Sequence, residues 1–281
     1  MLRLTFSFIM LFCAVLTHAQ PAPRRIVSMN LCTDQLLLLL VDRSRIASLS
    51  YFATNPDYSP LAAQAQGIPA NRGQTEEVLA FEPDLILTSQ FSATLAANLL
   101  ERLGHPVQRF GFAETADEVY THIQRVALLT GTQAQGERLI ADLLETISRE
   151  QALLQPRLQG KSAVFFASNG FSYGADTLQH DFLLSLGLRN IAADAGLSGP
   201  APLPLEVLLA AEPDFIFTDR RSALDAQLAH PLMQHPALGA LQGRTRMLEL
   251  PDVLFQCAGP QFAEAYRVLS AQLAAPIIDE L

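Results

Sequence analysis

Basic residues are scarce in this chain and nowhere clustered. The 281 residues include 19 lysines and arginines against 28 acidic residues, so the net charge at pH 7 is -9. Nucleic-acid binding needs a basic patch that meets the phosphates, and we therefore expect no nucleic-acid partner. With 49% hydrophobic residues, the chain is long enough for one large or two smaller globular domains with their own cores.

Several enzyme signatures are also missing. The chain has no G-x-x-x-x-G-K-[ST] phosphate loop, no H-E-x-x-H and no C-x-x-C. Asp176 and His180 are four residues apart and could orient one another on a helix face, but no nucleophile accompanies them, and the spacing is more typical of helix capping. The sequence therefore favours a protein that is not an enzyme, and no catalytic residue or cofactor is assigned.

Cysteine is rare, and one of the three cysteines lies in an N-terminal export signal. Arg3 precedes an apolar run over residues 4–16, and small residues follow it up to Ala19, where we expect cleavage. Thirteen apolar residues are too few for a membrane anchor, which needs roughly 20. Cys13 follows Phe12, whereas a lipidation signal would place Gly or Ala there. We expect a periplasmic protein.

The mature chain keeps two cysteines, Cys32 and Cys257. Two are too few for a disulfide scaffold. They could form one bridge, act as soft ligands in a binding site, or be unrelated buried thiols, and their separation in the sequence does not decide between these alternatives.

One passage occurs twice. Residues 75–90 (TEEVLAFEPDLILTSQ) and residues 205–220 (LEVLLAAEPDFIFTDR) are identical at eight of sixteen positions. Each copy predicts a helix, a turn at Glu-Pro-Asp and an apolar strand, because proline ends a helix and biases the residue before it toward extended angles. The repetition indicates two equivalent lobes.

Strands alternate with helices on both sides of a long helical segment. In the first half we expect strands at 25–29, 46–50, 85–88 and 107–110, helices at 33–41, 75–81 and 93–103, and a loop over 51–74. In the second half we expect strands at 163–167, 214–218 and 246–250, a short extended piece at 190–192, and helices at 178–186, 205–211 and 261–273. This alternation predicts an α/β protein with two Rossmann-like lobes and parallel sheets.

The segment between the halves has apolar residues at helical spacing and is divided at Gly131. A helix over 132–155 would be roughly 36 Å long, about the height of a lobe, and would join the lobes stiffly. An ordinary core helix of a single domain is the alternative. The expected organisation is a signal peptide (1–19), a first lobe (20–114), a linking helical segment (115–158) and a second lobe (159–281).

Together these features resemble a known family. RIVSMNLCTDQLLLLL, a Tyr-containing loop, the first E-x-x-x-x-x-x-P-D passage, a long helix and the second such passage are similar to periplasmic binding proteins that deliver iron-siderophore complexes, haem or cobalamin to ABC importers. The resemblance covers residues 24–275, and its specificity lies in the order of the motifs. It implies a class III, helical-backbone binding protein, expected to be a monomer, whose cargo is a small-molecule metal chelate and whose partner is a dimeric membrane permease.

The resemblance assigns a docking role to one pair of carboxylates. Glu76 and Glu206, each seven residues before the proline of its repeat, match the family position that contacts arginines of the two permease subunits. Such exposed pairs fix register and guide encounter, although each contributes only about 0 to 1 kcal/mol. Both residues would also suit the start of a helix, where the helix dipole stabilises them.

Ligands of α/β lobes bind at the carboxyl ends of the strands, so residues that follow strands are the candidates. Aromatic rings would stack on a flat chelate, and arginines would meet carboxylates or phosphates. The candidate cleft residues are Cys32, Tyr51, Phe91, Tyr173, Arg220, Arg221, Phe255 and Cys257.

Two features bear on the cargo. The chain has no tryptophan, whereas cobalamin binders often use indole rings, so here Tyr51 and Phe255 would have to supply flat surfaces. Free zinc or manganese is a rival cargo, but it needs three or four converging ligands, and only His180 is well placed among the histidines. We therefore expect a metal chelate and assign no metal ligand.

Overall fold

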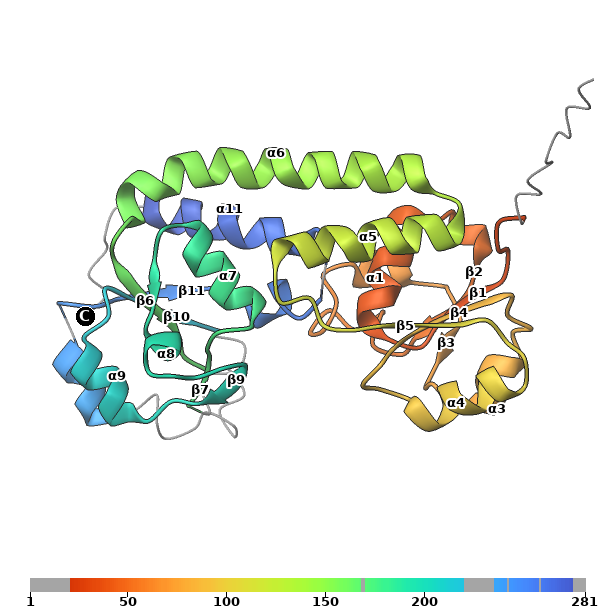
Figure 1. The fold of residues 1–281 in the computed structure, drawn as a ribbon, viewed down its shortest axis with the longest axis horizontal. Coiled ribbons are helices and arrows are strands. Elements are labelled where there is room, and N and C mark those ends of the chain that lie inside the picture. Colours follow the sequence, from red (N-terminus) through yellow and green to blue (C-terminus); the bar gives the residue numbers. More distant parts are fainter. Residues whose placement is uncertain (1–20, 168–169, 220–234, 242, 258, 275–281) are drawn as a thin grey trace, which may run out of the picture.

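The computed structural model describes residues 21–167, 170–219, 235–241, 243–257 and 259–274. Over these ranges the chain forms two α/β lobes that follow one another along the long axis of the molecule, with one long helix, α6, running along the upper edge of Figure 1. The predicted export signal lies outside the described residues. Within the described part of the chain, no helix combines the length and apolar character that a bilayer crossing needs.

The first lobe is built on a five-stranded parallel sheet with the order β3-β2-β1-β4-β5. Its elements are β1 (Ile26–Ser28), α1 (Leu31–Leu40), η1 (Arg43–Arg45), β2 (Ile46–Ser50), α2 (Ala62–Ala65), β3 (Ala70–Asn71), α3 (Thr75–Leu79), β4 (Leu85–Ser89), α4 (Thr94–Arg102) and β5 (Val107–Phe110). Since all strands are parallel, the loops that follow them gather at one edge of the sheet.

The second lobe has a four-stranded parallel sheet, β11-β10-β6-β8, and a separate antiparallel pair, β7 and β9. Its elements are β6 (Ser162–Phe165), β7 (Phe171–Tyr173), α7 (Leu178–Ser185), β8 (Arg189–Asn190), α8 (Ile191–Asp194), β9 (Pro200–Pro202), α9 (Leu205–Ala211), β10 (Phe215–Thr218), η3 (Pro236–Leu241), β11 (Arg246–Glu249), η4 (Asp252–Leu254) and α11 (Gln261–Ala274). The order β8-β6-β10-β11 reproduces β2-β1-β4-β5 of the first lobe, which confirms the fold class predicted from the sequence.

The two copies of the sequence repeat occupy equivalent places in the two sheets, β4 with α3 before it and β10 with α9 before it. In each copy the aspartate of the Pro-Asp pair accepts a hydrogen bond from the backbone at the neighbouring strand. Asp84 accepts a hydrogen bond from the backbone N–H of Arg25 (2.9 Å) next to β1, and Asp214 accepts one from the backbone N–H of Ser162 (2.8 Å) in β6. The Pro-Asp pair is therefore repeated because it positions the central strands of each lobe.

Two antiparallel helices, α5 (Ala116–Thr130) and α6 (Gln133–Leu158), fill the linking segment (Figure 1). Gly131 separates them with a left-handed backbone (φ 69°), a conformation that glycine adopts without strain. The 26 residues of α6 make a rod of about 39 Å. At the start of α5 the backbone N–H of Ala116 donates to the Asp181 carboxylate of α7 (2.9 Å), while α5 also packs on α1, so this helix contacts both lobes.

Three local expectations were wrong. α1 begins at Leu31 with Asn30 as its N-cap, because the Asn30 side chain accepts from the backbone N–H of Cys32 (2.9 Å) before Thr33 is reached. The segment expected as a loop over 51–74 contains the short elements α2 and β3. The piece expected to be extended at 190–192 is extended only at Asn190, the last residue of β8, and continues as the helix α8, because the Asn190 side chain accepts from the backbone N–H of Ala192 (3.0 Å).

Candidate functional site

A cavity of about 700 Å³ lies between the lobes. This volume falls within the roughly 300–1,000 Å³ of small-molecule sites. Its described lining from the first lobe and α5 comprises Asn30, Cys32, Thr33, Leu36, Ser89, Phe110, Gly111, Phe112, Ala113, Glu114 and His122. Its lining from the second lobe comprises Tyr173, Asp176, Thr177, Leu178, Gln179, Ser198, Gly199, Pro200, Asp252, Phe255 and Gln256. Residues at or after the ends of the parallel strands β1, β4, β5 and β11 make up a large part of this lining, as expected for a site at the carboxyl ends of strands, and residues 173–179 at the end of β7 add to it.

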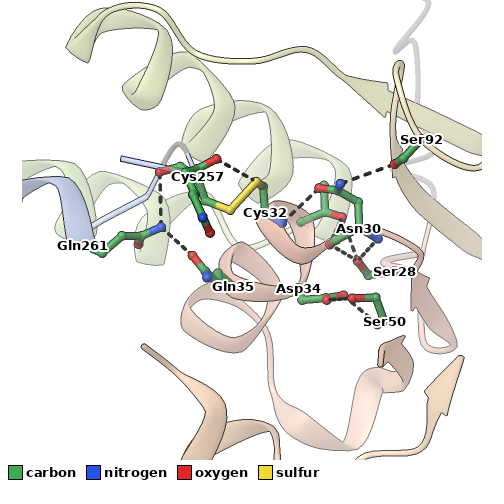
Figure 2. Close-up of a disulfide and its surroundings, with 11 residues drawn as sticks. Ser28, Asn30, Cys32, Asp34, Gln35, Ser50, Ser92, Cys257 and Gln261 are labelled. Carbon is green, nitrogen blue, oxygen red and sulfur yellow. Dashed lines mark hydrogen bonds between the residues drawn. A yellow bond between two sulfur atoms is a disulfide. The ribbon is translucent and has the colours of Figure 1, made fainter. Parts of the chain in front are cut away.

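The first turn of α1 forms part of the first-lobe wall and is held by a buried polar network (Figure 2). The Thr33 and Ser28 hydroxyls are 2.7 Å apart and share a hydrogen bond. One residue on, the fully buried Asp34 accepts from the backbone N–H of Ser50 at the end of β2 (3.0 Å). Burial raises the pKa of Asp34 to about 7, and the hydrogen bonds from Ser28 and Ser50 oppose this rise. The network fixes α1 to the sheet.

A stacked pair of exposed aromatic rings borders the cavity on the first lobe. The rings of Phe91 and Phe112 lie 4.6 Å apart and nearly parallel (9°), and they are 59% and 66% exposed. Phe112 lines the cavity, whereas Phe91, which the sequence nominated, is not among the lining residues and only stacks on Phe112. Two large apolar rings at the surface, held in one orientation, offer a flat platform to a ligand.

The second-lobe wall depends on a close approach of two backbone segments. A Cβ at Gly174 would clash with the carbonyl oxygen of Leu197, so only glycine allows the loop after β7 to lie against the loop before β9. Thr177 then caps α7 by accepting from the backbone N–H of His180 (3.1 Å). The Ser198 hydroxyl donates to Asp176 (2.7 Å) and joins the two loops at the cavity surface.

The deeper part of the second-lobe wall is acidic. Burial, reinforced by the neighbouring Asp219 carboxylate, raises the pKa of Asp252 to about 6. The Tyr173 hydroxyl donates to Asp252 over 3.5 Å, and burial followed by the charge of Asp252 raises the pKa of Tyr173. With Glu114 and Asp176, three carboxylates line the cavity, and the described lining residues include no lysine or arginine.

His122 of α5 is the single described histidine of the lining, although the sequence placed it away from the expected loops. Its ring lies edge-on to Phe110, with centroids 5.5 Å apart. Burial lowers the pKa of His122, so the imidazole is neutral at pH 7 and has a nitrogen lone pair available to a ligand. The linking segment therefore contributes to the cavity as well as joining the lobes.

The cavity contains some of the residues that the sequence nominated. Cys32, Tyr173 and Phe255 line it. Tyr51 does not: its ring, 49% exposed, packs at 3.9 Å on the ring of Phe52 in the loop after β2. Arg220 and Arg221 lie outside the described residues.

Cys32 and Cys257 form a disulfide, with their Cα atoms 4.9 Å apart (Figure 2). Of the three alternatives that the sequence left open, the bridge is the one that the structure contains. Two cysteines bonded to each other are not soft thiolate ligands, so that alternative is wrong.

The sequence missed the loop after β5, residues 111–114, and most of the loops at 176–179 and 198–200. The first could have been found, since it follows a strand end like the others. The loops at 176–179 and 198–200 could be found only by predicting that β7 pairs with β9. That pairing was not predictable, because β9 has prolines at both ends and proline disfavours a strand.

One enzyme pattern does occur in the chain, at Gly170–Gly174 (GFSYG), which has the form G-x-S-x-G. A nucleophile elbow places its serine on an exposed turn between a strand and a helix. Here Ser172 lies in the middle of β7, is fully buried and donates to the backbone carbonyl of Phe165 (2.6 Å). This serine therefore stabilises the β6–β7 packing and is not placed as a nucleophile.

Glu76 and Glu206 lie at the lobe ends away from α6. They are the second residues of α3 and α9, which occupy the two lower corners of Figure 1. Both are exposed, and within the described part of the chain neither carboxylate has a hydrogen-bond or ion-pair partner. Among the described residues, no three His, Cys, Asp or Glu side chains converge as metal ligands do.

Residues 26–242 match the profile of the family described as periplasmic binding protein. The chain belongs to this family. Within it, the chain is 26% identical over 218 residues to a cobalamin-binding protein of Halobacterium salinarum, an alignment that covers 74% of this chain and 58% of that protein. The chain thus spans somewhat more than half the length of this relative.

Solved structures of other binding proteins share the fold. A possible iron-binding, periplasmic solute-binding protein of Staphylococcus epidermidis superposes with a TM-score of 0.76 at 19% identity, over 90% of this chain and 100% of that one. The apo form of a periplasmic haem-binding protein from Roseiflexus sp. RS-1 superposes with a TM-score of 0.72 at 24% identity, over 88% and 97% of the two chains. The overall fold of this chain is therefore shared with these two binding proteins.

Proposed function

We propose that this chain is the extracytoplasmic substrate-binding protein of an ABC importer, that it captures a metal chelate in the cavity between its lobes, and that it hands the chelate to a membrane permease. The observation that carries the proposal is the cavity itself, which is lined from both lobes at the carboxyl ends of their strands. The names of the relatives support a chelate as cargo, since they include cobalamin-, iron- and haem-binding proteins. We propose that the chain binds its cargo without converting it chemically, which agrees with its membership of a family of binding proteins.

A compartment outside the cytoplasm agrees with two features of this chain. The N-terminal sequence has the pattern of a cleavable export signal. The Cys32–Cys257 disulfide is a bond that persists in oxidising compartments and is rare in the cytosol.

The charge of the described lining favours a chelate without net negative charge. Glu114, Asp176 and Asp252 would repel the carboxylates of haem or the oxygens of an anionic siderophore complex, and the described lining offers no lysine or arginine to meet them. A neutral or cationic corrinoid avoids this repulsion. We therefore place cobalamin-type chelates first, with Phe112 as the flat surface that a tryptophan would otherwise supply.

Permease docking rests on Glu76 and Glu206. Their equivalent positions in the two lobes suit two equivalent subunits of a permease dimer, and their exposed carboxylates are available to basic side chains. The monomer would present both at once, since α6 joins the two lobes as one rod.

A thermal-shift panel tests the proposed function. The purified chain without residues 1–19 is heated with hydroxocobalamin, cyanocobalamin, haem, and ferric complexes of a neutral and of an anionic siderophore. A ligand at a hundred times its dissociation constant adds about 2.7 kcal/mol of stability, or roughly 5–10 °C for a protein of this size. We expect a shift of this size from a corrinoid and a smaller one from haem. If no chelate shifts the melting temperature, the proposed function is wrong, and a larger shift from the anionic ligands would overturn the charge argument.

A further inference from the structure

The disulfide joins the two lobes at the cavity wall. Cys32 is the second residue of α1 in the first lobe, and Cys257 lies between η4 and α11 in the second, 225 residues further along the chain. Cys32 also lines the cavity. The bond is thus a second covalent connection between the lobes, in addition to the chain that passes through α5 and α6.

A buried hydrogen bond accompanies the disulfide. The Gln261 side-chain amide donates to the side-chain carbonyl of Gln35, and both residues are at most 8% exposed. Gln35 lies three residues after Cys32 in α1, and Gln261 lies four residues after Cys257 at the start of α11, so the two links run side by side (Figure 2). We call these four residues the cross-lobe latch.

The latch holds the segment that carries a large part of the second-lobe wall. Asp252, Phe255 and Gln256 line the cavity, and Cys257 follows them directly. Cys32 Sγ lies 3.5 Å from the Gln256 carbonyl oxygen, so the segment contacts α1 even beyond the disulfide. On the opposite side of the link, Thr33 of α1 lines the same cavity. The latch therefore sets the separation between two facing walls.

A rod along one edge does not fix the lobes by itself. Tilting about α6 would move α3 and α9 at the opposite edge, and it would also change the distance between α1 and the segment 252–257 (Figure 1). A bond with a fixed length between these two segments limits such tilts. If the cavity walls already have the separation that they have in the complex, the cargo does not have to order them. Such preorganisation improves affinity because it lowers the entropy cost of binding.

We propose that the cross-lobe latch is a positioning device for the cargo cavity: it holds Asp252 and Phe255 at a fixed distance from α1 and restricts the opening of the lobes. The inference rests on the proposed function in that it takes the cavity as the cargo site. When only a fraction of the molecules is competent to bind, the apparent dissociation constant rises by the inverse of that fraction. If unlatching leaves about a tenth of the molecules competent, cargo binds about tenfold more weakly.

The test combines a distance with an affinity. Spin labels on Ala80→Cys and Ala210→Cys, two exposed sites in α3–β4 and α9, report the separation of the lobes without cargo. In the chain with Cys32→Ser and Cys257→Ser, we expect a distance distribution broader by several ångströms and about tenfold weaker binding of the chelate selected in the thermal-shift panel, through slower apparent association, since fewer molecules are competent to bind. A purely structural disulfide would lower the melting temperature and leave both quantities unchanged, and that result would overturn the proposal.

Two further samples keep the test decisive. If the serine variant does not fold, the unlabelled wild-type protein with and without dithiothreitol gives the affinity comparison, and Gln35→Met with Gln261→Met, which keeps the disulfide, should give an intermediate loss of affinity. No change in both samples would count against the latch. The outcome is separate from that of the proposed function: a wild-type protein that binds no chelate refutes the function, whereas the label distances still decide whether the latch restrains the lobes.

Discussion

Replacing Asp252 with asparagine should make the protein more stable at neutral pH and a poorer binder of a cationic cargo. The carboxyl group lies in the cavity wall beside the Tyr173 hydroxyl, and the Asp219 carboxylate accepts a hydrogen bond from the backbone N–H of Asp252 (3.1 Å). Burial, and then the charge of Asp219, raises the pKa of Asp252 from 3.8 to about 6. The protein thus keeps an ionisable carboxyl group in the cavity wall at a cost in stability.

The sign and the size of this cost follow from proton linkage. A carboxyl group with a raised pKa holds its proton more tightly in the folded protein than in the unfolded chain, so the folded state loses stability as the pH rises from about 4 to about 6. A rise of about two pKa units corresponds to at most about 3 kcal/mol, fully present above pH 6 and absent below pH 4. Asparagine carries no charge and avoids this cost.

Urea unfolding at pH 7.5 and at pH 4 measures the effect. Asp252→Asn should gain up to about 3 kcal/mol over the wild type at pH 7.5 and little at pH 4. The matched control is Asp57→Asn, which removes an exposed carboxylate from the loop after β2 and should change stability by less than about 0.5 kcal/mol at either pH. A variant that is less stable than the wild type at pH 7.5, or equally stabilised at both pH values, would refute the reasoning.

Three other variants test separate parts of the proposal. Glu76→Ala with Glu206→Ala should weaken binding to permease-containing vesicles by up to about 30-fold, or about 2 kcal/mol for two exposed pairs, and should leave cargo affinity unchanged; full vesicle binding by the double variant would rule out the docking role. Phe112→Ala should weaken cargo binding by up to about tenfold in a calorimetric titration, with little change in melting temperature because the ring is largely exposed; an unaltered affinity would remove this ring from the site. Asp214→Ala should lower the free energy of unfolding in urea by about 1–3 kcal/mol, since the buried Ser162 loses its acceptor, and an undiminished stability would contradict the role assigned to the Pro-Asp pair.

The bilobal architecture could be predicted because its determinants are local and periodic. The two copies of the Glu-Pro-Asp passage lead into β4 and β10, the equivalent strands of the two sheets, and glycine at position 131 separates the two linking helices. Apolar spacing along α6 reflects its packing on α5 and α11. Each of these signals depends on residues that are close to one another in the sequence, so the sequence shows it directly.

The cavity was harder to predict because its walls are set by contacts between distant segments. The sequence could not pair Cys32 with Cys257, since 225 residues separate them and only the packing of α1 against the start of α11 brings them together. Tyr51 follows a strand as expected, yet its ring turns onto Phe52 and does not line the cavity. His122 lines the cavity because α5 contacts both lobes. The helical spacing of apolar residues in α5 does not reveal this position.

The most direct test of the central claim is an equilibrium titration of the purified chain with the chelate selected by the thermal-shift panel, compared with a variant whose cavity is blocked. Ser198 is exposed and lines the cavity, so Ser198→Trp should fill the space between the lobes without disturbing the core. We expect one chelate bound per wild-type chain and at least about a hundredfold weaker binding to the variant, which corresponds to about 2.7 kcal/mol. Equal affinities for the two proteins would show that the cavity between the lobes is not where the cargo binds.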